Sequence, residues 1–518
     1  MGVVGQPLML LERDGQLTGT HGTPADLEDN PLRGEDRFLA FLPALPLEQL
    51  GDPGFCRDHK LRYAYGAGAM ANGIASVELV VAMARAGMLG FFGAAGLSPA
   101  RVAEAVDRLQ REIPGLPFGV NLIHSPSEPA IEAAVADLLL DRGVKLIEAS
   151  AYLRLTLPVV RYRVKGIHRD AEGHIVTPNR IVAKVSRVEV ATQFFSPPPA
   201  EMLNELVRAG EITGEQAELA GQIPVAQDVT AEADSAGHTD NRPLVTLLPT
   251  MLALRDRLQE KFEYAHPLRV GAAGGLSTPA SIAAAFTMGA AYVLTGSVNQ
   301  ACVESGSSDI ARKLLAQAEQ ADTAMAPAAD MFEMGVKLQV LKRGTMFPMR
   351  ATKLWELYRA HSGLDAIPAA DREMLEKQFF RATLTDTWAD TRAFWQKRDP
   401  AQVERAERDP KHKMALVFRS YLGLSSRWAN AGEPSRALDY QIWCGPAMGA
   451  FNEWTRGTFL SQPENRRVAV VGLNLLYGAA LQLRLSALRL AGVTLPPALT
   501  AHVPLKEDEL NKRIASNE

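Results

Sequence analysis

The sequence of 518 residues contains only three cysteines, Cys56, Cys302 and Cys444, which lie far apart. This number and spacing fit neither a disulfide framework nor a cysteine metal site, and they are typical of a reducing cytosol. A basic excess is also lacking, because 55 Lys and Arg are balanced by 59 Asp and Glu, for a net charge of -4. Nucleic-acid-binding proteins usually carry a strong positive charge. We therefore expect a cytoplasmic protein that does not bind nucleic acid.

Long hydrophobic runs are missing as well. Residues 1–11 have no basic start followed by an apolar run, so no secretory signal is expected. The most apolar late stretch, 468–483, is interrupted by Gly472, Asn474 and Gln482. It falls short of the ~20 apolar residues of a membrane span, so the sequence predicts a buried helix and no span. Metal-binding and P-loop motifs are absent too, and we expect no metal.

What the sequence does contain is a regular alternation of short apolar runs and helical patterns between residues 61 and 329. Eight such steps within one domain are the number that closes a (β/α)8 TIM barrel, so we predict an α/β fold of this type. The expected strands are 61–70, 89–92, 118–123, 144–149, 180–185, 223–231, 268–272 and 292–294. Between the fourth and fifth strands, residues 158–178 predict a β-hairpin insert.

The segments on either side of the barrel differ from it in composition. Residues 1–60 are rich in Gly, Pro and Asp, which predicts an N-terminal arm of short strands wrapped on the main body. After residue 330 the strand signals disappear, and Arg, Trp, Leu and Ala-rich helical patterns follow. We expect a helical domain over the barrel mouth at 330–495 and a tail at 496–518.

Glycines follow the last two expected strands, as Gly274-Gly275 and as Gly296-Ser297. Without side chains, such turns let a phosphate approach backbone N–H groups, and the loops after strands seven and eight are the usual phosphate site of barrels. The alternative is that the glycines only allow tight turns. We favour phosphate binding, because the two loops would be neighbours in space.

Small residues also end the first expected strand, where 66–71 reads GAGAMA. The match to G-x-G-x-x-A suggests a dinucleotide fold, but 89–96 contains no acid to hold a ribose, which disfavours it. At a barrel mouth, Ala69 and Met70 would instead let a flat ring lie against the backbone. Asn121 and Lys184 end the third and fifth strands and can donate to carbonyl oxygens of such a ring. For Lys184, a rim salt bridge is an equal alternative.

The turn 233–242 after the sixth strand contains His238 among small and polar residues. A histidine at a strand end is well placed for proton transfer, because its reference pKa is near neutrality. A structural role is an equally weighted alternative. Further along, residues 331–349 are rich in Met and basic side chains and predict a helix over the barrel mouth. A contact surface for an acidic partner or an anionic cofactor is the other interpretation.

Together these motifs resemble the PfaD family, the trans-acting enoyl reductases of polyunsaturated fatty acid and trans-acyltransferase polyketide synthases, which are related to nitronate monooxygenases. The passages that carry the resemblance are 65–76 (YGAGAMANGIAS), 228–243 (DVTAEADSAGHTDNRP), 270–279 (VGAAGGLSTP) and 330–350 (DMFEMGVKLQVLKRGTMFPMR). It extends from about residue 50 to 490. Ala236 departs from the family, in which a glycine commonly precedes the Gly-His pair.

The resemblance implies an FMN-containing barrel that takes hydride from NADPH, or NADH, and reduces a 2-enoyl thioester carried by an acyl carrier protein. The partner would be a polyketide or fatty acid synthase. The residues that the resemblance assigns are Gly274, Gly275, Gly296 and Ser297 for the FMN phosphate, Ala69, Met70, Asn121 and Lys184 for the flavin ring, and His238 for catalysis. The helical domain could dock the acidic carrier protein, and the docking charges that we expect there are Lys337, Lys342 and Arg343. Two alternatives stay open: a nitronate monooxygenase-type flavin oxidase and a non-catalytic synthase subunit.

Overall fold

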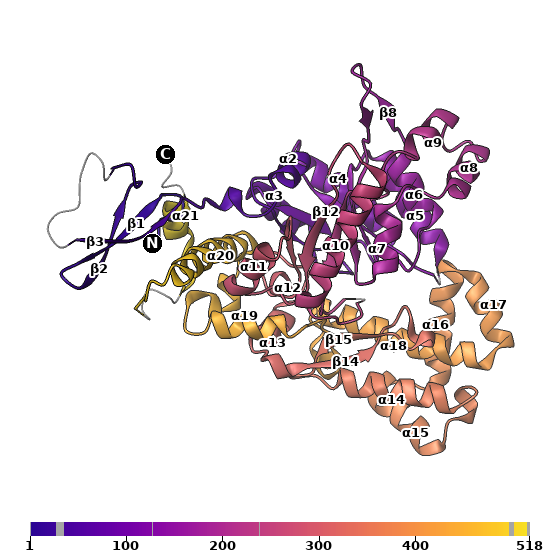
Figure 1. Ribbon diagram of the computed structural model, residues 1–518. Helices are drawn as coiled ribbons and strands as arrows, with labels where there is room; N and C mark the ends of the chain where they lie inside the picture. Colours follow the sequence, from indigo (N-terminus) through magenta and orange to yellow (C-terminus); the bar gives the residue numbers. More distant parts are fainter. Residues whose placement is uncertain (1, 27–35, 127, 238, 497–501, 515–518) are drawn as a thin grey trace.

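The computed structural model describes residues 2–26, 36–126, 128–237, 239–496 and 502–514, and a closed barrel of eight parallel strands forms its centre (Figure 1). The order around the barrel is β10-β11-β12-β13-β4-β5-β6-β7, and β10 pairs with β7 to close it. The barrel strands are β4 (Tyr65–Ala67), β5 (Leu89–Phe92), β6 (Gly119–Ile123), β7 (Leu146–Ser150), β10 (Arg180–Val185), β11 (Asp228–Glu232), β12 (Arg269–Ala273) and β13 (Val293–Thr295). The predicted (β/α)8 barrel is confirmed.

Helices follow every barrel strand. They are α3 (Val77–Arg85), α4 (Pro99–Glu112), α5 (Pro129–Asp141), α6 (Leu157–Val164), α7 (Val188–Phe195), α8 (Ala200–Arg208), α9 (Gly214–Ala220), α10 (Leu244–Phe262), α11 (Pro279–Thr287), α12 (Ser297–Gln300) and α13 (Asp309–Ala316). Helices α4 and α11 are capped by Ser98 and Thr278, whose side chains accept hydrogen bonds from backbone N–H groups of the first turn. A proline, Pro99 or Pro279, occupies the first helical position of each helix. These are ordinary helix-start signals, and both helices begin within a residue of where the sequence predicts them.

The expected hairpin insert at 158–178 is partly wrong. Its first half is the helix α6, and only the short strands β8 (His168–Arg169) and β9 (Ile175–Val176) form a hairpin. The run Val160-Arg-Tyr-Arg-Val164 alternates like a strand with its arginines outside. In the structure Arg163 is buried, and it donates hydrogen bonds to the carbonyl oxygens of Pro224 and Asn179. Both sides of the segment are therefore covered by protein, and the arginine does not mark a side that faces water.

The opposite end of the barrel is closed by α2 (Pro53–His59), which the sequence assigned to the N-terminal arm. Phe55 stacks on Tyr292 with ring centroids 4.0 Å apart. The buried His59 lies with Nε2 2.8 Å from a carboxylate oxygen of Asp228, which also pairs with Arg269. This end of the barrel is therefore filled by side chains.

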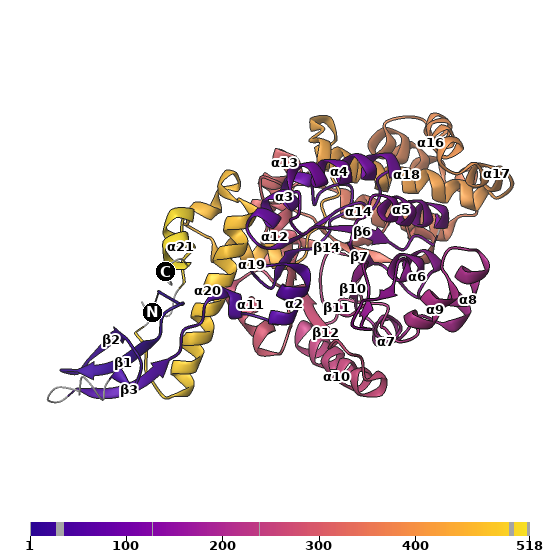
Figure 2. The ribbon, with the colours of Figure 1, turned by 90° about the horizontal axis from the view of Figure 1, so that it is seen from above.

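The N-terminal residues form a separate antiparallel sheet of β1 (Leu8–Arg13), β2 (Gln16–His21) and β3 (Arg37–Leu42), in the order β2-β1-β3. Figures 1 and 2 show this sheet at one end of the molecule, beyond the barrel. Leu8, Leu10 and Leu42 pack against Leu488 and the turn that follows it. The predicted short strands are present, but they project from the body instead of wrapping around it.

The C-terminal part is mostly helical, and it also contains a two-stranded antiparallel sheet. Its elements are β14 (Thr323–Pro327), β15 (Lys337–Leu341), α14 (Phe347–Ala360), α15 (Ala369–Met374), α16 (Leu384–Arg398), α17 (Pro400–Arg408), α18 (Pro410–Ala431), α19 (Ala447–Trp454), α20 (Val468–Leu490) and α21 (Glu507–Ile514). The helix expected at 331–349 is therefore wrong at β15. In β15, Leu338 and Val340 are buried while Lys337 is exposed, so buried residues recur at every second position, as in a strand.

Helices α14 to α18, which we call the cap, have a hydrophobic core of their own around Phe332, Phe347 and Phe418. In Figure 1 the cap helices gather on one side of the barrel. Helix α20 instead packs against α11 and α3 of the barrel, and its residues belong to the barrel core. It is the one helix among the described residues that is long and apolar enough to cross a membrane, and 72% of its apolar window is buried in the protein. The division of the chain into arm, barrel, helical domain and tail stays a proposal.

Candidate active site

A cavity of about 780 Å³ lies between the carboxyl ends of the barrel strands and the cap helices α16 and α18. In barrels of this kind the active site is built at this end of the strands. All eight residues that the sequence assigns to a cofactor line the cavity: Ala69, Met70, Asn121, Lys184, Gly274, Gly275, Gly296 and Ser297. They come from five different strand ends, so the fold brings them together as the sequence implies.

The two glycine loops lie side by side at this end, since β12 pairs with β13. Gly274 and Gly275 both have positive φ, 86° and 72°, which other residues adopt only with strain. A Cβ on Gly274 would lie 2.7 Å from the carbonyl group of Ala233, whereas a Cβ on Gly275 or Gly296 would meet nothing within 4 Å. Gly275 and Gly296 thus border open space, and we call this surface the glycine cradle.

Lys184 is held between two carboxylates that no sequence motif singled out. Its Nζ atom lies 3.6 Å from an oxygen of Glu148 and 3.3 Å from an oxygen of Glu232. The predicted rim salt bridge is therefore present, and Lys184 also lines the cavity. Burial acts to lower the pKa of Lys184, but the attraction of Glu148 and Glu232 outweighs it, and the pKa is raised. The lysine is a fixed positive charge at the barrel mouth.

Glu148 is fully buried beneath this lysine. One of its oxygens accepts a hydrogen bond from the backbone N–H of Ala69 at 3.0 Å, and its Oε1 atom has no partner among the described residues. Burial raises the pKa of Glu148 to about 7, an effect that Glu232 strengthens and Lys184 opposes. The sequence did carry a signal for Glu148, because an acid inside a predicted barrel strand is unusual.

Asn121 is oriented by the barrel itself. Its amide nitrogen donates to the backbone carbonyl of Glu148 at 3.0 Å and to the hydroxyl of Ser150 at 2.8 Å. Both of its N–H groups are thereby engaged, so the expected donation by Asn121 to a bound ring is not available in this arrangement. Its carbonyl oxygen is left as an acceptor toward the cavity that it lines.

His238 lies outside the described residues, but the turn around it is described. The backbone N–H of Asp234 donates to the carbonyl of Arg242 at 2.9 Å and closes the turn. The carboxylate of Asp234 accepts from Asn241 at 2.7 Å and from Gln339 of β15 at 2.6 Å. Residues 234–237 line the cavity. The turn that carries His238 is therefore anchored at its base and borders the cavity.

The cap contributes the other wall of the cavity. One face of α16 lines it with residues three or four apart, from Thr387 and Asp390 to Phe394 and Arg398. Arg398 is bidentate to Glu128 of the loop before α5, a contact that joins cap and barrel. No sequence signal pointed to these residues, because nothing in a helical pattern tells which face meets a distant barrel.

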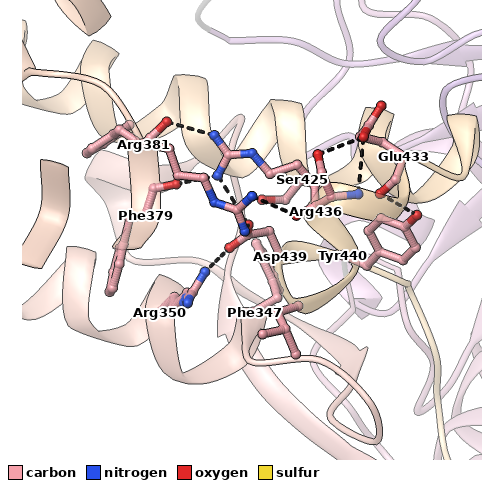
Figure 3. Close-up of polar contacts among 12 residues, drawn as sticks. Phe347, Arg350, Phe379, Arg381, Ser425, Glu433, Arg436, Asp439 and Tyr440 are labelled. Carbon is pink, nitrogen blue, oxygen red and sulfur yellow. Dashed lines mark hydrogen bonds and ion pairs between the residues drawn. The ribbon is translucent and has the colours of Figure 1, made fainter. Parts of the chain in front are cut away.

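A buried polar cluster joins the cap to the segment Pro434–Asp439, which follows α18, as Figure 3 shows. Asp439 is fully buried and lies against Arg350 and, at 3.2 Å, Arg436. Arg436 also donates to the carbonyl oxygens of Phe379 and Phe380, both at 2.7 Å, at the end of a π-helical turn. These contacts satisfy backbone groups that the irregular turn leaves unpaired.

The three residues predicted to dock a carrier protein lie on and after β15. Lys337 and Lys342 are exposed and have no ion-pair partner within the described part of the chain. Arg343 is paired with Asp322 at 2.5 Å and with Glu319 at 3.5 Å, so its charge is already matched within the chain. Docking by these residues stays a proposal, which Lys337 and Lys342 support better than Arg343.

One group of acidic and histidine side chains in the described residues is close enough to hold a cation. It consists of Asp170, Glu172 and His174 at the tip of the β8–β9 hairpin. Glu172 and His174 are exposed, and the group does not border the cavity. Such exposed clusters are common without an ion, so this group is not part of the candidate active site.

Comparison with known proteins agrees with the geometry. The sequence pattern of the nitronate monooxygenase family matches residues 59–361, and that of the inserted helical domain of acyl-carrier-protein S-malonyltransferase matches residues 361–440. A polyunsaturated fatty acid synthase subunit of Thraustochytrium sp. is 50% identical over 450 residues, which are 86% of this chain and 30% of that protein. Polyketide biosynthesis protein PksE of Bacillus subtilis is 46% identical over 84% of this chain and 57% of its own length.

A solved structure is similar over most of the chain. The enoyl reductase domain of MlnA, from the macrolactin biosynthesis cluster of Bacillus amyloliquefaciens, is 38% identical with a TM-score of 0.80. The match covers 86% of this chain and 99% of that domain. This chain spans 30% of the Thraustochytrium protein and 57% of PksE, and both extend well beyond the shared part. The chain belongs to the nitronate monooxygenase family, among its PfaD-like members with an added helical segment.

Proposed function

We propose that this chain is an FMN-dependent enoyl reductase that uses NADPH or NADH to reduce the 2,3 double bond of enoyl-acyl-carrier-protein thioesters in polyketide or polyunsaturated fatty acid synthesis. One observation carries the proposal: the cavity joins a glycine cradle at the barrel mouth to a helical cap. The likeness to an enoyl reductase domain at 38% identity supports it.

The residues at the barrel mouth fit FMN. Gly275 and Gly296 border a space that a Cβ would fill, which suits a phosphate approaching backbone N–H groups. Gly274 and Ser297 would complete the phosphate site. Ala69, Met70, Asn121 and Lys184 would face the ring, where the positive charge of Lys184 suits an electron-rich heterocycle. When bound, FMN supplies the route by which two electrons pass from nicotinamide to the double bond.

The reaction requires charge control that this site can provide. C3 of the enoyl chain gains a hydrogen with two electrons, C2 gains a proton, and NADPH or NADH becomes NADP⁺ or NAD⁺. Negative charge develops on the thioester oxygen and C2, so a nearby acid or cation lowers the barrier. His238 is the candidate for polarising that oxygen or protonating C2, and Asp234 anchors its turn.

The cap gives the site its access to a carrier protein. The match of residues 361–440 to a domain of acyl-carrier-protein S-malonyltransferase supports a carrier-borne substrate. Lys337 and Lys342 offer exposed positive charge of the kind that steers an acidic carrier protein, with Arg343 beside them. The relatives in synthases of fatty acids and polyketides support a synthase as the assembly partner.

Oxidation of a nitronate by molecular oxygen is the second candidate, and the family match over residues 59–361 favours it. A small free nitronate needs neither a cavity of about 780 Å³ nor a cap that contributes Phe394 and Arg398 to its wall. We therefore rank it below enoyl reduction. A non-catalytic synthase subunit is the third candidate, and it predicts a colourless protein.

The test begins with the visible spectrum and the cofactor released from the purified chain. We expect a flavin band and FMN. The chain is then mixed with NADPH or NADH and a crotonyl thioester of a carrier protein, and the product is identified by mass spectrometry. A saturated thioester formed in step with nicotinamide oxidation supports the proposal. A colourless chain, or oxidation of nitronate without reduction of the thioester, contradicts it.

A further inference from the structure

Four arginines line the cavity, and three of them have a carboxylate partner. The pairs are Arg398 with Glu128, Arg419 with Glu333 and Arg436 with Asp439. Arg427 of α18 differs, since no acidic side chain of the described residues lies within ion-pairing distance of it, and its guanidinium makes no hydrogen bond there. Among the four arginines of the cavity wall, Arg427 is therefore the one whose charge has no acidic partner in the described part of the chain.

Arg427 is positioned by an aromatic ring. Its guanidinium carbon lies 5.7 Å from the ring centroid of Phe394 on α16, and that of Arg398 lies 5.7 Å from the same ring. Phe394 is 40% exposed although it is a large apolar side chain, and Leu424, one turn before Arg427, is 39% exposed. All of these residues line the cavity. The wall thus combines apolar surface with a cation.

Acidic side chains are also present on this wall. Asp390 lies one turn before Phe394 on the same face of α16, and it is not ion-paired with Arg427. Glu128 is neutralised by Arg398. The guanidinium of Arg427 is therefore available to an anion. An arginine fork suits a phosphate in particular, because it donates two parallel hydrogen bonds.

This wall belongs to the cap, whereas the glycine cradle belongs to the barrel. A substrate whose double bond lies at the barrel mouth would extend its remaining length along the cap wall. The carrier arm bears its phosphate at the end remote from the thioester, with an uncharged chain between them. Phe394 and Leu424 beside Arg427 offer apolar surface to such a chain, and Arg427 offers a cation to its phosphate.

We propose that Arg427, supported by the ring of Phe394, binds a phosphate ester of a substrate on the cap side of the cavity. The inference rests on the proposed function and adds a substrate-binding residue to it. The same chemistry has two sources, the phosphopantetheine arm and the nicotinamide nucleotide. The apolar surface of Phe394 and Leu424 beside Arg427 favours the arm, and the experiment separates the two.

Binding is measured by titration calorimetry on the full chain with its cofactor. The probes are crotonyl-4′-phosphopantetheine and crotonyl-pantetheine, which differ only in the phosphate. We expect the wild type to bind the phosphorylated probe about 10-fold more tightly, as one charge-assisted contact predicts. Arg427→Ala should bind both probes equally, and Arg427→Lys should recover part of the preference. Arg408→Ala, which removes an exposed arginine of the cap away from the cavity, should behave as the wild type.

The nucleotide is tested with the same proteins. If Arg427→Ala weakens NADPH binding and keeps the preference for the phosphorylated probe, the nucleotide is the source and the phosphate site stands. If Arg427→Ala binds NADPH and the phosphorylated probe as tightly as the wild type does, the inference is wrong. Reduction of crotonyl-4′-phosphopantetheine by the wild type is measured in parallel. If the wild type is active but shows no preference for the phosphorylated probe, and Arg427→Ala leaves NADPH binding unchanged, the inference alone is contradicted. If the wild type is inactive, the proposed function is contradicted.

Discussion

Gly274 and Gly275 are neighbours with similar backbone angles, yet a side chain would meet different surroundings at each. At Gly274 it would strike the backbone of Ala233, and at Gly275 it would enter open space. We predict that Gly275→Val folds but loses FMN, because the side chain fills the space in which the phosphate would approach N–H groups. The measurement is the flavin-to-protein ratio after gel filtration.

The matched control is Gly210→Val. Gly210 has a φ of 73° against 72° at Gly275, and a Cβ there also meets nothing within 4 Å, but Gly210 is not one of the residues that line the cavity. The backbone strain of the two variants is therefore comparable. Unchanged FMN content in Gly275→Val, or equal loss in both variants, would place the phosphate elsewhere.

His238 is predicted to act in only one half of the reaction. His238→Ala should keep FMN and still be reduced by NADPH, because the residue is assigned to the thioester. Its reoxidation by an enoyl thioester should slow by about 10²–10⁴-fold, the usual contribution of a general acid. Stopped-flow absorbance measures each half separately. Equal slowing of both halves would indicate a structural role, and normal rates would remove His238 from the mechanism.

Glu148 makes the stability of the fold depend on pH. Its pKa is 4.5 in an unfolded chain and about 7 when buried. Between these values the unfolded chain loses the proton first, so the free energy of unfolding falls as pH rises. The total fall in the free energy of unfolding is about 3 kcal/mol. We predict that Glu148→Gln, which does not titrate, lacks this fall when urea unfolding is compared at pH 4.5 and pH 7. Parallel decreases in variant and wild type would disprove the effect.

At the scale of residues, the sequence predicted the cavity-lining residues that directly follow or end a barrel strand. Ala69, Lys184 and the glycines were found because each barrel strand must end at the mouth. Glu232 was missed because its partner Lys184 lies on a different strand, and ion pairs between strands follow from the closed barrel. Arg427 and Phe394 were missed because their role depends on how two helices meet the barrel.

At the scale of elements, the cap depends on Asp439. This carboxylate lies against Arg350, and it also accepts a hydrogen bond from the hydroxyl of Tyr421 at 2.7 Å. Removing one partner of a buried ion pair leaves the other charge unmatched, which typically costs about 3–5 kcal/mol. We predict that Asp439→Asn lowers the free energy of unfolding by this amount. Urea denaturation followed by tryptophan fluorescence measures it.

The control for this variant is Glu373→Gln, in the same region of the chain. Glu373 pairs with Lys377 at 2.5 Å, but both side chains are exposed, so water replaces the lost contact. Its stability should equal that of the wild type. Equal stability of Asp439→Asn and Glu373→Gln would show that the cluster of Figure 3 does not hold the cap together.

The elements themselves were predicted well where local signals and burial agree. Strands β5 and β10 have the bounds that the sequence predicts, because each is a short apolar run between turns. Helix α6 and strand β15 were misassigned. In α6 the buried arginine Arg163 broke the rule that charged residues face water. In β15 a strand signal of only five residues lay among Met-rich segments typical of helices.

At the scale of the whole molecule, the arrangement of barrel and cap could not be predicted in detail. The sequence indicated a helical segment near the mouth, but its separate core and its contact through Arg398 and Glu128 arise only on folding. Figures 1 and 2 show the N-terminal sheet at the far end from the cap helices. The candidate active site therefore lies between two units, and its outer wall belongs to the cap.

The central claim is that this site reduces enoyl thioesters. The direct test is an anaerobic stopped-flow experiment with two arms. In the first, the chain reduced with one equivalent of NADPH is mixed with the crotonyl thioester of a carrier protein; in the second, the oxidised chain is mixed with a nitronate. We predict rapid return of the oxidised flavin spectrum and one saturated thioester per site in the first arm, and no reduction of the flavin by the nitronate in the second. Reduction of the oxidised flavin by the nitronate, together with a thioester that the reduced chain leaves unchanged, would contradict the claim.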